Sequence, residues 1–156
     1  MAENPFMRRA IELAVENVEG GHGGPFAALV VRNGTILAEG TNLVTSANDP
    51  TAHAEVVAIR RACSTLGSFQ LTGCDIYATC EPCPMCLGAI YWARPRCLYF
   101  GATSEDAAAA GFDDSFLFEQ LRLPPTDRRI PARQVMRDEA LAVFEAWSSK
   151  PDRIPS

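Results

Sequence analysis

Residues 53–55 read His-Ala-Glu, and residues 82–86 read Pro-Cys-Pro-Met-Cys. Imidazole nitrogen and thiolate sulfur are the ligands that zinc prefers, and a catalytic zinc site leaves one of its four tetrahedral positions open. Cys83 and Cys86 are three residues apart, so they share one face of a helix that begins near Pro84. The sequence therefore predicts a zinc site with His53, Cys83 and Cys86 as protein ligands and water as the fourth.

Glu55 stands two residues after His53, a spacing that points two side chains apart within a helix. At the first turn, however, both side chains reach a point beyond the helix end. We therefore place the metal in front of two helix N-termini, which also help to keep Cys83 and Cys86 as thiolates. Zinc with two thiolates and a neutral imidazole carries no net charge and acidifies water weakly. We expect Glu55 to assist by taking the proton of the water and delivering it to the substrate.

A closed, structural zinc site is the alternative. Cys80 or Cys74 then supplies the fourth ligand, and the metal only holds the fold together. Structural sites usually show four evident ligands in paired spacing, which disfavours this alternative. Glu55 alone is also typical of a solvated first-turn carboxylate. Cys63, Cys74 and Cys97 are typical of small buried hydrophobic residues.

Helices and strands alternate around the two motifs. Asn33-Gly34 is typical of a two-residue hairpin turn. The expected strands are residues 26–31, 35–41, 75–78, 97–100 and 133–136. The first expected helix begins at Pro5. The others run from Asp49 to about Leu66, from Pro84 to before Pro95, from a cap at Ser104 to Gly111, and from Asp138 to Ser148. A hairpin followed by alternating helices and strands predicts an α/β fold with a mixed five-stranded sheet between two helical layers.

Length and composition indicate one globular domain, residues 1–156, with 47% hydrophobic and 21% charged residues. The net charge of −5 argues mildly against nucleic acid, whose binding proteins usually carry a basic stripe. The N-terminus has no apolar run after its positive charges, and no stretch approaches transmembrane length, so we expect neither a signal peptide nor a membrane. Six cysteines without an export signal indicate a cytoplasmic protein.

The two motifs together carry a family resemblance. H-x-E followed by P-C-x-x-C is the signature of zinc deaminases, and the sequence resembles the cytidine deaminase superfamily from about residue 5 to 148. Residues 49–55 and 81–89 are specific for its purine-acting branch, and residues 86–95 and 110–116 are similar to bacterial guanine deaminases. The resemblance implies a three-layer cytidine deaminase-like fold, one zinc ion per subunit and hydrolytic deamination of guanine, a purine substrate.

The resemblance also implies roles for residues outside the metal site. Asp114 is expected to bind the amino edge of the purine and to act as a second proton carrier. The other implied substrate contacts are Asn42, Phe26, Trp92 and Ala54. Residue type alone leaves ordinary roles open: Asn42 in a turn, Asp114 or Asp113 as a helix cap, and the aromatic residues in the core.

Guanine deaminases of this kind form dimers that exchange their C-terminal segments, so the resemblance implies a homodimer in which residues 121–156 are exchanged. Two adjacent prolines within residues 121–129 suit a stiff hinge, although an ordinary surface loop has the same composition. The tail after Trp147 has no aromatic residue to contribute to a lid. Three alternatives remain: a tRNA adenosine deaminase, a deaminase of cytosine, a pterin or an aminotriazine, and a zinc-stapled binding module without turnover.

Overall fold

The computed structural model describes residues 3–156. The chain divides into two compact units, Met1–Asp114 and Ser115–Ser156. None of the helices formed by residues 3–156 has the length and apolar character that a membrane span requires. The helices of the first unit are α1 (Pro5–Glu19), α2 (Val44–Ala47), α3 (Ala54–Leu66), α4 (Pro84–Ala93) and α5 (Ser104–Ala109).

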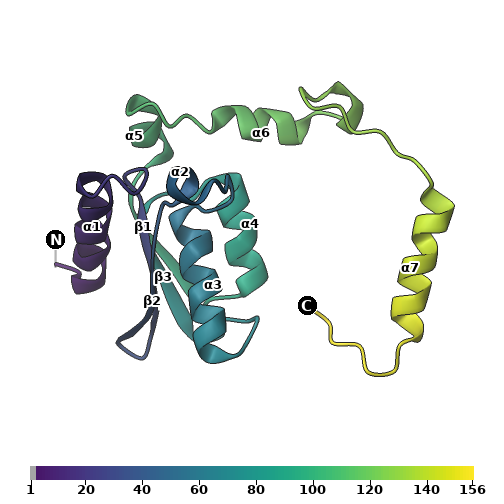
Figure 1. Cartoon of the computed structure of the whole chain (residues 1–156), viewed down its shortest axis with the longest axis horizontal. Helices are drawn as coiled ribbons and strands as arrows, with labels where there is room; N and C mark the ends of the chain where they lie inside the picture. Colours follow the sequence, from purple (N-terminus) through teal and green to yellow (C-terminus); the bar gives the residue numbers. More distant parts are fainter. Residues whose placement is uncertain (1–2) are drawn as a thin grey trace. The chain divides into compact units, whose positions relative to one another are not determined.

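A mixed sheet in the order β2-β1-β3-β4 forms the centre of the first unit (Figure 1). Strand β1 runs antiparallel to both β2 and β3, whereas β3 and β4 are parallel. Asn33 and Gly34 have φ angles of 50° and 74°, as a two-residue hairpin turn requires, so the expected turn is confirmed. The strands are β1 (Ala27–Arg32), β2 (Thr35–Thr41), β3 (Cys74–Cys80) and β4 (Cys97–Ala102).

Helices cover both faces of this sheet, and alternate residues of β1 separate the two cores. Ala28 and Val30 pack with α3 and α4 on one face. Leu29 and Val31 pack with α1 on the other face. Figure 1 shows α1 on one side of the sheet and the pair α3 and α4 on the other. The expected three-layer α/β/α fold is therefore confirmed, with the cysteine-bearing helix beside the histidine-bearing helix.

The expected helix start at Asp49 was wrong, because α3 begins at Ala54. The Asp49 carboxylate accepts hydrogen bonds from the backbone N (2.8 Å) and the hydroxyl (2.7 Å) of Thr51. Such a bond closes a local turn that competes with the helix. The later start makes His53 the N-cap residue, so its side chain projects beyond the helix end. One smaller correction is similar: the cap of α5 is Thr103 and not Ser104.

The expected fifth strand, residues 133–136, was also wrong. These residues have no regular secondary structure, and the sheet has four strands. A β-strand requires a neighbouring strand for its backbone hydrogen bonds, and residues 115–156, taken as a unit, contain none. This second unit consists of α6 (Ser115–Arg122), the 3₁₀ turn η1 (Pro125–Asp127) and α7 (Arg137–Ser149).

Candidate active site

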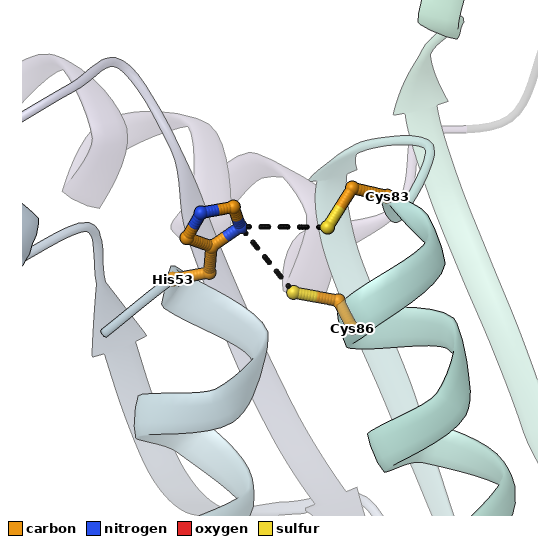
Figure 2. A group of neighbouring side chains, drawn as sticks. All are labelled: His53, Cys83 and Cys86. Atoms are coloured by element: carbon orange, nitrogen blue, oxygen red, sulfur yellow. Dashed lines mark hydrogen bonds between the residues drawn. The ribbon is translucent and has the colours of Figure 1, made fainter. Parts of the chain in front are cut away.

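Three side chains that the sequence predicted as metal ligands meet at the N-termini of α3 and α4. His53 and Cys83 are the N-cap residues of these helices, both with extended backbone angles, and Cys86 lies in the first turn of α4. His53 Nδ1 is 3.6 Å from Cys83 Sγ and 3.5 Å from Cys86 Sγ. Figure 2 shows the imidazole extending from α3 toward the two sulfur atoms on α4.

The separations of these atoms match those of a zinc site. Zinc–sulfur bonds of about 2.3 Å and zinc–nitrogen bonds of about 2.0–2.1 Å at tetrahedral angles place sulfur and nitrogen about 3.6 Å apart. The two separations in the structure, 3.5 and 3.6 Å, agree with that value. Both nitrogen–sulfur separations therefore suit zinc, and Nδ1 is the imidazole nitrogen that faces the two sulfur atoms.

The closed-site alternative needs a fourth ligand. Cys74 is fully buried in the core. The Cys80 thiol faces the backbone oxygen of Thr103 at 3.6 Å. Within residues 3–156, the cluster of ligand atoms that lie within 4.8 Å of one another contains His53, Cys83 and Cys86 and neither of these thiols. A tetrahedral ion at this cluster thus keeps one position for a non-protein ligand.

The two thiols of the cluster differ in their affinity for a proton. A hydrogen bond from Cys86, with a smaller contribution from the hydrogen bond with His53, lowers the pKa of Cys83 to about 4 against the effect of burial. The same bond to Cys83, together with burial and the Glu55 carboxylate, raises the pKa of Cys86. Cys83 is therefore a thiolate at neutral pH. A bound cation competes with the proton of Cys86, because a metal ligand must be deprotonated.

Glu55 is the one carboxyl group in the first turn of α3. Its side chain is 9% exposed, and its Oε2 accepts a hydrogen bond from Cys86 Sγ at 3.4 Å. Burial raises the pKa of Glu55 above the ordinary carboxyl value. A carboxyl group whose pKa moves toward neutrality both takes and returns protons more readily, which suits general acid–base chemistry.

The start of α3 is held close to the sheet by a glycine. A Cβ atom on Gly40 of β2 would lie 2.3 Å from the backbone oxygen of Ala54 and 2.5 Å from the backbone nitrogen of Ala58. No other residue fits there without moving α3. Ala54 itself is buried between His53 and Glu55. Its backbone N–H is one of the first four of the helix, which have no partner within the helix.

Asn42 and Phe26 lie side by side at the ends of β2 and β1. The backbone N–H of Asn42 donates to the Phe26 carbonyl at 3.1 Å, and its side-chain Oδ1 accepts from the backbone N–H of Val44 at 3.2 Å. The side chain thus serves the turn, as residue type alone suggested, and keeps its amide nitrogen for another acceptor. The turn role expected from residue type and the substrate contact implied by the resemblance are therefore compatible for Asn42.

Phe26 contacts a residue that the sequence analysis did not single out. Its ring lies edge-on to Phe112, with ring centroids 5.0 Å apart and an interplanar angle of 87°. Phe112 stands two residues before Asp114 in residues 110–116, the segment similar to guanine deaminases. This position was the only sequence signal that could have identified Phe112 as a candidate site residue. The contact attaches that segment to the wall formed by Phe26.

Asp114 lies close enough to the metal cluster for the charge of Cys83 to influence its carboxyl group. Burial raises the pKa of Asp114, and the negative charge of Cys83 raises it further. Burial, together with the negative charges of Glu55, Glu81 and Asp114, raises the pKa of Cys80 to about 11. The structure therefore brings Glu55 and Asp114 to the same region, although they are far apart in the sequence.

These features, an open three-ligand cluster beside a buried glutamate, agree with a family comparison. The model of the cytidine and deoxycytidylate deaminase zinc-binding region matches residues 2–102. The chain belongs to the cytidine and deoxycytidylate deaminase family. The matched range holds both helix N-termini and all three ligands of this deaminase, so the family's zinc-binding region coincides with the cluster in Figure 2.

Relatives of this deaminase extend the match beyond the zinc-binding region. It is 55% identical to the guanine deaminase of Bacillus subtilis over 147 residues, 94% of each chain. It is 46% identical to the tRNA-specific adenosine deaminase of Agrobacterium fabrum over 85 residues, which are 54% of this chain and 56% of that protein. The X-ray structure of the Bacillus subtilis guanine deaminase has a TM-score of 0.96 and 52% identity over 99% of each chain. The guanine deaminase of Nitrosomonas europaea has a TM-score of 0.68 at 35% identity, over 73% of this chain and 67% of that one.

Trp92, an expected wall of the substrate pocket, lies at the opposite end of α4 from the metal ligands Cys83 and Cys86. It is the penultimate residue of α4 and is 69% exposed. Nine residues of helix separate it from Cys83, or about 13 Å along the axis at about 1.5 Å per residue. Its expected contact with the substrate therefore stays a prediction.

Proposed function

We propose that this deaminase hydrolyses guanine to xanthine and ammonia. The observation that carries the proposal is the open cluster of His53, Cys83 and Cys86 beside the buried carboxyl of Glu55. His53 Nδ1 and the two sulfur atoms would hold the metal. When bound there, zinc would supply Lewis-acid chemistry that lowers the pKa of water. Because a site with two thiolates and one imidazole does this only weakly, a nearby base is needed.

Glu55 moves the protons of the reaction. Its carboxylate takes a proton from the water that attacks the amino-bearing ring carbon, and it passes this proton to a ring nitrogen. The second proton of the water goes to the amino group, the carbon–nitrogen bond breaks, and ammonia leaves. Water supplies the oxygen of the product, so no other reactant is needed. The raised pKa of Glu55 brings the group nearer to the value at which it serves as both acid and base.

Asp114 recognises the guanine edge. Guanine presents a ring N–H and an amino group side by side, and an ionised carboxylate accepts hydrogen bonds from both. Adenine has no amino group at the equivalent carbon, so the carboxylate would be left without a partner against it. Asp114 would also exchange a proton with the leaving amine, as a second carrier beside Glu55.

Three further groups complete the pocket. The Asn42 amide nitrogen donates to an acceptor on the ring, since its Oδ1 is engaged by Val44. The edge-on pair of Phe26 and Phe112 offers an aromatic surface against the flat purine. The free backbone N–H of Ala54 offers a further donor. Trp92 would add a second aromatic wall to the pocket.

We propose that the chain forms a homodimer that exchanges part of its C-terminal unit, about residues 121–156. The support is the apolar character of α7: Val143, Phe144 and Trp147 are all exposed, and no residue of this helix is buried. Exposed apolar side chains on one helix mark an interaction surface. We also infer a cytoplasmic location, which the six free cysteines support.

The function is tested by measuring ammonia release from guanine, adenine, cytosine, an aminotriazine and tRNA with the zinc-loaded protein. We expect guanine to be the best substrate and Glu55→Gln to abolish the signal. Preferential release from tRNA would overturn the proposal in favour of an adenosine deaminase of tRNA. Preference for another free ring would keep the chemistry and replace the substrate.

A further inference from the structure

Asn17 is a buried amide on the otherwise apolar inner face of α1. Its side chain is 4% exposed, and its buried neighbours on this face are Ala10, Leu13 and Ala14. Asn17 Nδ2 donates to the backbone oxygen of Gly24 at 2.9 Å and to that of Asn42 at 3.0 Å. One side chain thus joins the glycine-rich segment after α1 to the end of β2.

The two acceptors lie in the segments that carry two residues of the proposed purine pocket, Phe26 and Asn42. Gly24 stands two residues before Phe26, and the backbone N–H of Asn42 donates to the Phe26 carbonyl at 3.1 Å. The two segments are also in close contact, because a Cβ atom on Gly23 would lie 2.1 Å from the backbone oxygen of Asn42. Asn42 is therefore held at its N–H by Phe26 and at its carbonyl by Asn17.

We propose that Asn17 is a positioning residue for base recognition. With both backbone groups of Asn42 fixed and its Oδ1 bonded to Val44, the remaining amide nitrogen has one direction in which to meet a ligand. This inference rests on the proposed role of Asn42 in binding guanine. A purely structural role is the competing explanation, because any buried amide must be hydrogen-bonded to be tolerated. The two explanations differ in whether Asn17 acts through Asn42.

A double-mutant cycle separates them. We would measure kcat and KM for guanine in Asn17→Ala, Asn42→Ala and the double variant, together with zinc content and melting temperature. Asn17→Ala is expected to raise KM by about tenfold with little change in kcat, the size of one strong buried hydrogen bond. In the Asn42→Ala background the same change is expected to have no further effect on kcat/KM. Zinc content stays at one per chain throughout.

Two additional variants complete the design. Asn17→Asp keeps the shape of the side chain but removes its donors, so we expect the same rise in KM as for Asn17→Ala. If one of the two Asn17 variants fails to fold, the other is used for the measurement. Leu13→Ala, buried on the same face of α1, is expected to lower the melting temperature and leave KM unchanged. An unchanged KM in the Asn17 variants, or an equal loss in both backgrounds, would overturn the inference. If Asn42→Ala alone leaves kcat/KM unchanged, the proposed role of Asn42 fails and this inference fails with it.

Discussion

His53 Nδ1 lies 3.5 Å from Cys86 Sγ, although 33 positions separate the two residues in the sequence. Each residue lies at the beginning of its own helix, so this distance depends on the offset between α3 and α4 along their axes. Contacts between α3, α4 and the sheet fix that relation through the core that includes Ala58, Ala62 and Ile90. The geometry of the metal cluster is therefore a property of the packed core as well as of the two motifs.

Removal of one sulfur ligand should remove the metal. Cys83→Ala leaves two protein donors for a tetrahedral ion, so we expect a large loss from about one zinc per chain, measured by elemental analysis of the purified protein. Cys63→Ala, the same substitution at a thiol outside the cluster, should retain zinc. Full zinc occupancy in the Cys83 variant would refute the three-ligand site.

Neutralising the proton carrier should separate metal binding from turnover. Glu55→Gln keeps the size of the side chain but cannot take a proton, so we expect kcat to fall by about 10²–10⁴-fold with zinc content and melting temperature retained. Glu12→Gln, an isosteric change on the exposed face of α1, should leave kcat unchanged. The proposed role of Glu55 is untenable if its zinc-loaded variant turns over guanine at a nearly normal rate.

Asp114 should determine the choice between guanine and adenine. Asp114→Ala removes the acceptor for the guanine edge, and a buried hydrogen bond of this kind discriminates by factors on the order of 10⁴. We expect the ratio of kcat/KM for guanine to that for adenine to fall sharply in this variant. Asp113→Ala is the neighbouring control and should keep the ratio. An equal preference for guanine in wild type and Asp114→Ala would return Asp114 to the role of a helix cap.

Crowding the contact between β2 and α3 should disturb both stability and metal binding. Gly40→Ala places a methyl group against the backbone of Ala54 and Ala58, and overpacking of this kind costs about 1–3 kcal/mol. We expect a lower free energy of unfolding and weaker zinc binding, because the start of α3 moves. Gly88→Ala is the matched control, since a Cβ atom there meets nothing within 4 Å. Equal stability of the two variants would contradict the steric explanation.

The proposed dimer should have twice the chain mass of 16.9 kDa. Light scattering at micromolar concentration measures this directly, and a monomer mass would refute the dimer. Phe144→Asp places a charge on the exposed apolar side of α7, so we expect it to shift the protein toward monomer. Ser148→Asp on the same helix introduces the same charge without removing an apolar side chain and should keep the dimer.

Local patterns in the sequence were sufficient for most of the fold and for the metal cluster. The spacing of Cys83 and Cys86 and the hairpin turn at Asn33 depend on neighbours in the sequence, so the sequence contains the information. The start of α3 was misplaced because the side chain of Asp49 forms a turn with Thr51, which competes with helix formation. Local pattern does not show which of these two alternatives is more stable.

Features that depend on distant residues were not predictable in this way. The assignment of residues 133–136 as a strand failed because pairing depends on a neighbour that this unit does not provide. The contact between Phe26 and Phe112 joins segments far apart in the chain. The choice of Nδ1 on His53 and the bonds of Asn17 likewise follow only once the helices are packed against the sheet.

The boundary between the two units falls directly after Asp114. The metal ligands, Glu55, Asn42 and Asp114 all precede this boundary, so one continuous segment encodes the reacting groups. We expect an engineered chimaera that replaces residues 115–156 to keep the zinc cluster, because its ligands and the core that supports α3 and α4 lie in the first unit.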